Sequence, residues 1–122
     1  MTEAWLVLAI APLGGLGALI RWRLQVLLPA TPSRVITGVL VANTLGAFFA
    51  GFLLGLPTTW WSTAVLVGLC GSLTTLSTLA LDIVEPVRNG RVLRAVVLAS
   101  THLVAGGVAL FLGLTLASVS TL

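Results

Sequence analysis

The chain is 122 residues long, with 58% hydrophobic and only 7% charged residues, whereas soluble domains carry roughly 25% charged residues. Its six arginines and three acidic residues give a net charge of +3, which is too small and too scattered to make nucleic acid a partner. We therefore expect one domain, residues 1–122, whose apolar surface faces membrane lipid.

Four apolar segments separated by short polar connections predict an all-α membrane protein with four transmembrane helices. Each segment exceeds the ~20 residues that a helix needs to cross hydrocarbon. Two prolines lie in the first connection, and Pro57 opens the second. At the third, Pro86 cannot continue helical bonding, so we expect the chain to turn there, helped by Asn89-Gly90. The approximate spans are residues 4–28, 35–56, 60–85 and 92–119.

The arginines predict how the segments are oriented. Short connections make neighbouring segments antiparallel, so the first and third connections share one side of the membrane and the termini share the other. All the arginines flank the first and third connections, which predicts a cytoplasmic location for these connections and an outward location for both termini. The charges around the third connection are interpreted as solvated residues at the membrane interface. The arginines are Arg21, Arg23, Arg34, Arg88, Arg91 and Arg94.

The middle of the third segment concentrates polar side chains. Five hydroxyl residues fall between Ser72 and Thr78, next to Gly71. Isolated hydroxyls in a membrane helix bond back to the carbonyl four residues earlier, but this density predicts a helix that is broken near mid-membrane. Non-helical backbone at this depth persists only where it is buried in protein or lines a polar cavity. Carbonyls freed at such a break can coordinate Na⁺.

Two further polar residues lie deep in apolar segments. Asn43 shares a stripe of small residues with Ala47 and Gly51, where its amide can either bond a neighbouring helix or donate to an anion. His102 is the only histidine. A membrane histidine is costly and often functional, with a packed neutral imidazole as the alternative. Four thin helices are too few to enclose a wide pore alone, so we expect an oligomer.

Three motifs in chain order resemble those of the small bacterial fluoride channels, the Fluc (CrcB) family. The first is a glycine-rich start ending in Gly-Ala-x-x-Arg, which closes at Arg21. The second is Asn-x-x-Gly-[Ser/Ala]-Phe, which begins at Asn43. The third is Gly-x-x-Gly-x-Leu-Thr-Thr-Phe-Ser-Thr-Phe, which covers residues 68–79 with leucine at both phenylalanine positions. The resemblance extends over nearly the whole chain.

The resemblance implies an antiparallel dimer in the bacterial cell membrane, with two fluoride pathways and no enzymatic reaction. A central Na⁺ would be held by the main-chain carbonyls of Gly71 and Thr74. Asn43 would donate to fluoride, and Arg21 would lie at a vestibule. The other residues expected along the pathway are Leu76, Ser77, Thr78, Leu79 and His102.

Departures from the family pattern fall on residues that would line the anion pathway. Leu76 and Leu79 replace phenylalanines, whose ring edges carry partial positive charge. An ungapped continuation into the fourth segment finds Leu98, His102 and Gly106 where polar residues are usual. The motif that would hold Na⁺ is intact. Besides a conducting channel subunit, a partner subunit with a degenerate pore is therefore an alternative.

The arginine bias bears on the expected partner. An antiparallel dimer of one sequence requires insertion in both orientations, whereas the bias here favours a single orientation. We therefore expect an oppositely oriented homologue rather than a second copy of the chain. A small four-helix multidrug exporter is the less favoured alternative, because it needs a carboxylate deep in the membrane. The acidic residues Glu3, Asp82 and Glu85 all lie near segment ends.

Overall fold

The structure, a computed structural model, describes residues 2–120 and the side chains of residues 4–120. Every regular element in this range is helical, which confirms the expected all-α class. The elements are α1 (Thr2–Leu27), α2 (Gly38–Leu54), α3 (Trp60–Ala64), the wider π-helical turn η1 (Val65–Cys70), α4 (Gly71–Leu73), α5 (Leu76–Arg88) and α6 (Val92–Ser120).

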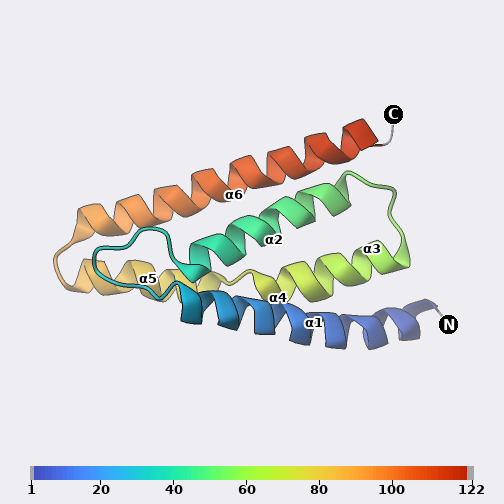
Figure 1. Cartoon of the computed structure of the whole chain (residues 1–122), viewed down its shortest axis with the longest axis horizontal. Helices are drawn as coiled ribbons and strands as arrows, with labels where there is room; N and C mark the ends of the chain where they lie inside the picture. Colours follow the sequence, from blue (N-terminus) through green and yellow to red (C-terminus); the bar gives the residue numbers. More distant parts are fainter. Residues whose placement is uncertain (1, 121–122) are drawn as a thin grey trace.

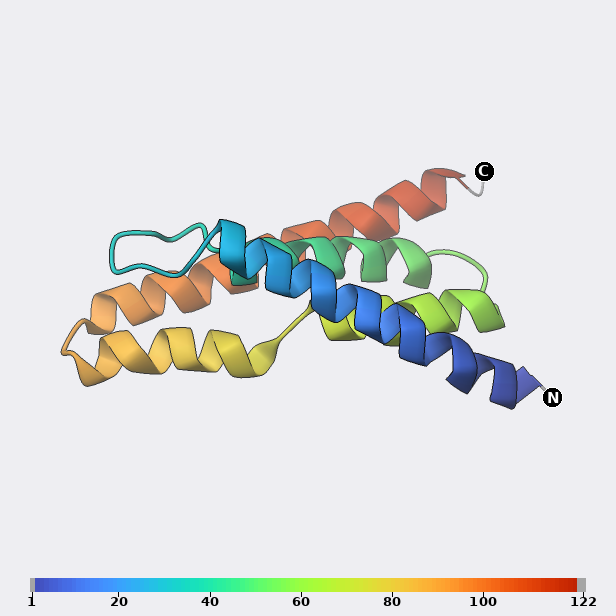
Figure 2. The ribbon, with the colours of Figure 1, turned by 60° about the horizontal axis from the view of Figure 1, so that its bottom comes forward.

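The helices run antiparallel along one long axis (Figure 1). Helix α2 packs mainly against α6, α1 packs against η1 and α4, and α5 packs against α6. The connection between α1 and α2 lies at the same end of the molecule as the turn between α5 and α6, and the chain ends lie at the other (Figure 1). Figure 2 shows an extended stretch of chain between α4 and α5.

Three helical stretches are long and apolar enough to cross a membrane: Ala4–Leu27, Trp60–Arg88 and Val92–Ser120. The second predicted span, residues 35–56, is too long. Its helix α2 has only 17 residues rather than 22. Its start is set by Thr37, which has extended backbone and accepts a hydrogen bond from the Leu40 N–H. A threonine in this N-cap position fixes where the helix begins.

The third segment also differs from expectation, because α5 continues past Pro86 to Arg88. Proline removes one helical hydrogen bond, and in the last turn of a helix this loss does not unwind what precedes it. The expected turn at Asn89-Gly90 is present, and Gly90 has a φ of +72°, a conformation that glycine adopts without a steric penalty. The Arg91 N–H then bonds to the Pro86 carbonyl at 2.7 Å.

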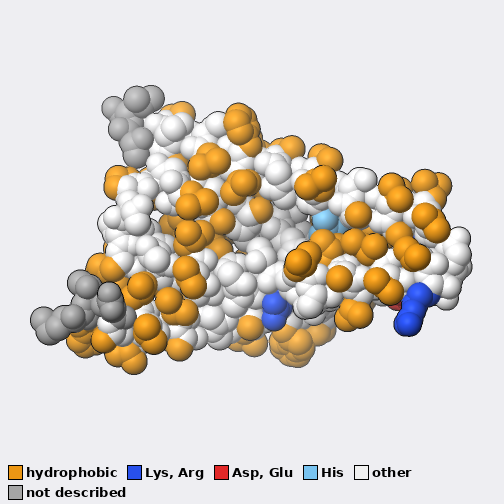
Figure 3. All heavy atoms as spheres, turned by 180° about the vertical axis from the view of Figure 1, so that it is seen from behind, with side chains coloured by type: hydrophobic (Ala, Val, Ile, Leu, Met, Phe, Trp, Pro, Cys, Tyr) orange, Lys and Arg blue, Asp and Glu red, His pale blue; other side chains and the backbone are white. Residues whose placement is uncertain are grey.

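Much of the surface is apolar. Figure 3 shows hydrophobic side chains spread over the length of one face, with few charged side chains among them. Leu76, Leu93 and Leu103 are each 78% exposed. The most deeply buried side chains are small, such as Ala42 and Ala117 at 0% exposure. A thin bundle of this kind leaves its large side chains for lipid or for another protein chain.

Candidate functional site

The helical backbone of the third segment stops at Thr74 and Thr75. Both residues are extended, with ψ angles of 152° and 120°, and they separate α4 from α5. We call these two residues the third-segment break. The backbone N–H of Thr74 still bonds to the Cys70 carbonyl at 3.1 Å. The loss of helical geometry therefore begins after this bond.

Asn43 of α2 binds both backbone groups of Thr75. Its Oδ1 accepts the Thr75 N–H at 2.8 Å, and its Nδ2 donates to the Thr75 carbonyl at 3.3 Å. In a continuous helix the Thr75 N–H would bond to the carbonyl of Gly71. The Asn43 amide takes this donor, so the Gly71 carbonyl is released from the helical ladder.

The Thr75 side chain caps the start of α5. Its Oγ1 accepts the Thr78 N–H at 3.3 Å, and it lies 3.2 Å from the hydroxyls of both Ser77 and Thr78. In a continuous helix the Thr78 N–H would bond to the Thr74 carbonyl. The cap therefore releases a second carbonyl, which accepts a hydrogen bond from Arg21 Nη1 at 3.3 Å.

The remaining hydroxyls of the cluster have a simpler role. Ser72 Oγ donates to the Gly68 carbonyl at 2.7 Å, and Thr74 Oγ1 donates to the Cys70 carbonyl at 3.0 Å. These bonds to the carbonyl four residues earlier are compatible with an intact helix. The residue that distinguishes the break is Thr75, which was not among the predicted site residues. The sequence signal that could have identified Thr75 is the spacing of an N-cap. A threonine hydroxyl at this position accepts the N–H of the third residue that follows it, here Thr78.

Glycines bring α1 and α2 close to the break. A methyl group at Gly17 would collide with Ser72 Oγ, and one at Gly46 would collide with the Thr74 methyl. In a membrane, small residues let helix backbones approach in this way. The motif glycines that precede Arg21 and follow Asn43 therefore set the distances over which these two side chains reach the break.

The expected pathway residues are dispersed in the single chain. Arg21, Asn43 and Thr74 meet at the break. By contrast, Leu76 is 78% exposed and Ser77 is also exposed, whereas Thr78 and Leu79 are partly buried. His102 is buried in α6, where its Nδ1 lies 2.9 Å from the Leu98 carbonyl.

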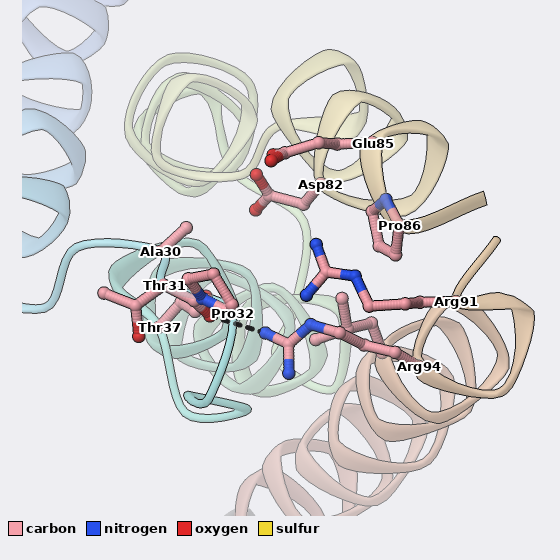
Figure 4. A pocket seen from close by; sticks show the side chains of 10 residues that line it. Ala30, Thr31, Pro32, Thr37, Asp82, Glu85, Pro86, Arg91 and Arg94 are labelled. Carbon is pink, nitrogen blue, oxygen red and sulfur yellow. Dashed lines mark hydrogen bonds between the residues drawn. The ribbon is translucent and has the colours of Figure 1, made fainter. Parts of the chain in front are cut away.

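A second polar feature lies where the first and third connections meet. A cavity of about 70 Å³ is lined by residues of both connections and by α5 and α6. Arg94 Nη2 donates to the Thr31 carbonyl at 2.6 Å and to the Arg34 carbonyl at 2.8 Å. Figure 4 shows Arg91 and Arg94 on one side of the cavity and Asp82 on another. Arg94 therefore holds the first connection against α6, a structural role that the interpretation as solvated interface charges missed.

Comparison with known proteins adds to this geometry. The model of the family described as "CrcB-like protein, Camphor Resistance (CrcB)" matches residues 8–114. A Fluoride-specific ion channel FluC of Pseudomonas syringae pv. maculicola is 36% identical over 85% of both chains. Fluoride-specific ion channel FluC 2 of Nocardia farcinica is 40% identical over 82% of this chain and 76% of its own length. A FluC of Paraburkholderia phymatum is 31% identical over 94% and 96%.

The chain belongs to the CrcB family. This membership confirms the resemblance drawn from the three motifs. The relatives are named ion channels, so the family is an ion channel family rather than an enzyme family, in agreement with the expectation that the chain catalyses no reaction. Together with the three long apolar stretches, this membership identifies a multi-pass membrane protein.

The carbonyls that the CrcB resemblance assigns to Na⁺ are chemically suited to a cation. The Gly71 carbonyl loses its helical donor, the Thr75 N–H, to Asn43. The Thr74 carbonyl loses its helical donor, the Thr78 N–H, to the Thr75 hydroxyl. Neutral backbone oxygens are typical ligands of hard cations. The Thr74 carbonyl also accepts a hydrogen bond from the Arg21 guanidinium, and a carbonyl oxygen has a second lone pair that a cation can use. The residues present therefore fit the ion.

Proposed function

We propose that this chain is a subunit of a fluoride-selective channel in the bacterial cell membrane. Such a channel lets fluoride leave the cytoplasm and so lowers its toxicity. The observation that carries the proposal is the break built by Asn43 and Thr75 in a chain whose relatives are named fluoride-specific ion channels. Backbone that departs from a helix within a membrane persists where it is buried in protein or lines a polar cavity, and a fluoride pathway is such a cavity.

The polar groups near the break suit a small anion. Fluoride is strongly hydrated, so a pore must replace its water with close donors. The Asn43 amide has two N–H groups, of which one bonds to the Thr75 carbonyl and the second is a donor for fluoride. The hydroxyls of Ser77 and Thr78 are further donors. Arg21 supplies positive charge that attracts an anion to the vestibule.

The carbonyls of Gly71 and Thr74 would hold a structural Na⁺. When bound, the ion supplies a fixed positive charge and satisfies carbonyls that the broken helix leaves over. The chain's own contribution is to keep these carbonyls out of the helical ladder. Asn43 does this for Gly71 and the Thr75 hydroxyl does it for Thr74.

The partner that we propose is an oppositely oriented homologue, and a second copy of this chain is the alternative. The arginine bias supports a single orientation, so an antiparallel dimer would need a chain with the reverse bias. The exposure of Leu76 next to the break supports an interface on this face. A partner could also supply aromatic edges that Leu76 and Leu79 lack.

Fluoride efflux from liposomes tests the proposal. The purified chain is reconstituted alone and, separately, with a homologue of reverse arginine bias, and chloride efflux is the control. Fluoride-selective efflux in either sample supports a channel subunit, and efflux only with the homologue supports the hetero-oligomer. Absence of fluoride efflux from both samples contradicts the proposed function. In the chain alone, a gain of flux in the Leu76→Phe, Leu79→Phe double variant would support a degenerate pore.

Cysteine labelling tests the orientation separately. Single cysteines are placed at each terminus in a Cys70→Ala background, and intact cells are treated with a membrane-impermeant thiol reagent. Labelling of both termini from outside, with no additional labelling after the cells are opened, is the expected result. Comparable labelled fractions from the two sides would show mixed insertion, and would favour a second copy of this chain as the partner.

A further inference from the structure

The imidazole of His102 has one ring nitrogen that is buried without a partner. His102 is 8% exposed, and its Nε2 is the single buried side-chain polar atom without a hydrogen bond among residues 4–120. Buried polar atoms are nearly always paired, because an unpaired one loses its bonds to water without replacement. An orphan atom of this kind points to a ligand or a change of protonation state.

The other ring nitrogen limits what Nε2 can do. Nδ1 lies 2.9 Å from the Leu98 carbonyl, and a carbonyl can only accept a hydrogen bond. The proton of a neutral imidazole must therefore be on Nδ1, which leaves Nε2 as a bare acceptor. An acceptor lone pair repels an anion. Once Nε2 binds a proton, the same atom becomes a charged donor, and charge-assisted hydrogen bonds are the stronger kind.

We propose that His102 is a proton-controlled fluoride-binding residue: fluoride binds at Nε2 when the imidazole is protonated and is rejected when it is neutral. The inference rests on the proposed fluoride pathway and makes that pathway sensitive to pH. The proton comes from the aqueous phase and no covalent bond changes. The Nδ1–H bond to Leu98 is kept in both states, so the ring need not move.

The depth of His102 agrees with this role. His102 lies ten residues after Val92, the first residue of α6, and Leu79 lies nine residues before Arg88, the last residue of α5. At 1.5 Å per residue, both are on the order of 14–15 Å from the turn that joins the helices. Because α5 and α6 pack against each other, His102 lies at the same depth as Leu79, which replaces a pathway phenylalanine of the family motif.

The charged groups that face His102 come from α5 and from α6 itself. The elements that pack on α6 are α2 and α5, and α2 has no ionisable side chain. On α5, the Asp82 carboxylate lies near enough to interact electrostatically with His102. Glu85 and Arg88 follow it toward the turn, and Arg94 is eight residues before His102 on α6 itself. Asp82 is therefore the group outside α6 whose charge acts on this site.

Nuclear magnetic resonance of the full chain in lipid nanodiscs tests the proposal directly. With ¹⁵N-histidine labelling and a tag that contains no histidine, the ring signals belong to His102 alone. We expect the Nδ1–H tautomer at high pH. We also expect NaF, compared with NaCl at equal ionic strength, to raise the titration midpoint, by about half a pH unit at a fluoride concentration of twice its Kd. A midpoint that is the same in both salts, or an Nε2–H tautomer, would overturn the inference.

A flux measurement separates this inference from the proposed function. In the conducting assembly, fluoride efflux should rise about tenfold between pH 8 and pH 5.5, because fluoride binding at Nε2 requires the protonated imidazole. His102→Gln should remove the pH dependence, and Thr101→Ala should retain it. Protein-free liposomes correct for hydrogen fluoride that crosses the lipid. Fluoride-selective efflux with no pH dependence contradicts only the role of His102. Absence of efflux at every pH contradicts the proposed channel function. In that case the resonance data decide whether His102 binds fluoride.

Discussion

The third segment and the fourth are alike in length and hydropathy but differ in continuity. Trp60–Arg88 and Val92–Ser120 each have 29 residues, with mean hydropathies of 1.8 and 2.0. The fourth segment contains Gly106, Gly107 and several hydroxyl residues, and yet α6 is continuous. Glycine and hydroxyl content therefore does not by itself break a membrane helix.

The difference lies in where the polar groups find their partners. In α6, Thr101 Oγ1 bonds to the Val97 carbonyl at 2.7 Å, within its own helix. In the third segment, a side chain of another helix, Asn43, binds both backbone groups of Thr75. A break in a membrane helix is thus stable when a neighbouring helix satisfies the backbone groups that the break exposes.

Replacing Asn43 with leucine should have the largest effect. Asn43→Leu removes the partner of both the Thr75 N–H and the Thr75 carbonyl, and each buried unsatisfied group costs about 1–3 kcal/mol. We expect a loss of about 2–6 kcal/mol in the free energy of unfolding in bicelles, together with loss of fluoride efflux. The control is Thr44→Val, the adjacent polar residue of α2. Unchanged stability and efflux in Asn43→Leu would show that the break does not depend on α2.

The parts of this arrangement that the sequence predicts are those with a local signal. Apolar runs predict the helices, and the hydroxyl cluster marks the region of the break. Sequence spacing cannot reveal that Asn43 binds Thr75 across 32 positions, or that Arg21 reaches the Thr74 carbonyl across 53. These contacts depend on how closely the helices approach, which is a property of the packed structure. The sequence also places the start of α2 too early. The Thr37 cap makes the helix begin at Gly38, three residues after the predicted start at residue 35.

Gly113 of the continuous helix α6 should contribute to stability, because it lets α6 pack closely against α2. A methyl group at Gly113 would collide with the Phe48 carbonyl and lie 2.7 Å from the Phe52 N, whereas at Gly107 it would meet nothing within 4 Å. We expect Gly113→Ala to destabilise the α2–α6 pair by about 1–3 kcal/mol. Gly107→Ala, the matched control on the same helix, should be neutral or stabilise by up to about 1 kcal/mol. Equal unfolding free energies for the two variants would mean that α2 and α6 are less closely packed.

The smallest predicted effect separates the two threonines of the break. Thr75→Val removes the hydroxyl that accepts the Thr78 N–H, and loss of an N-cap costs about 1 kcal/mol. Thr74→Val removes only a bond back to the Cys70 carbonyl and keeps the methyl group that faces Gly46, so its stability should change by less than about 0.5 kcal/mol. Valine has nearly the shape of threonine, so the pair compares hydroxyls rather than packing. The measurement is the free energy of unfolding of each variant in bicelles, and Thr75→Ser should restore most of the loss because serine caps equally well. If Thr74→Val were the more destabilising change, the break would be held by the end of α4 instead of the start of α5.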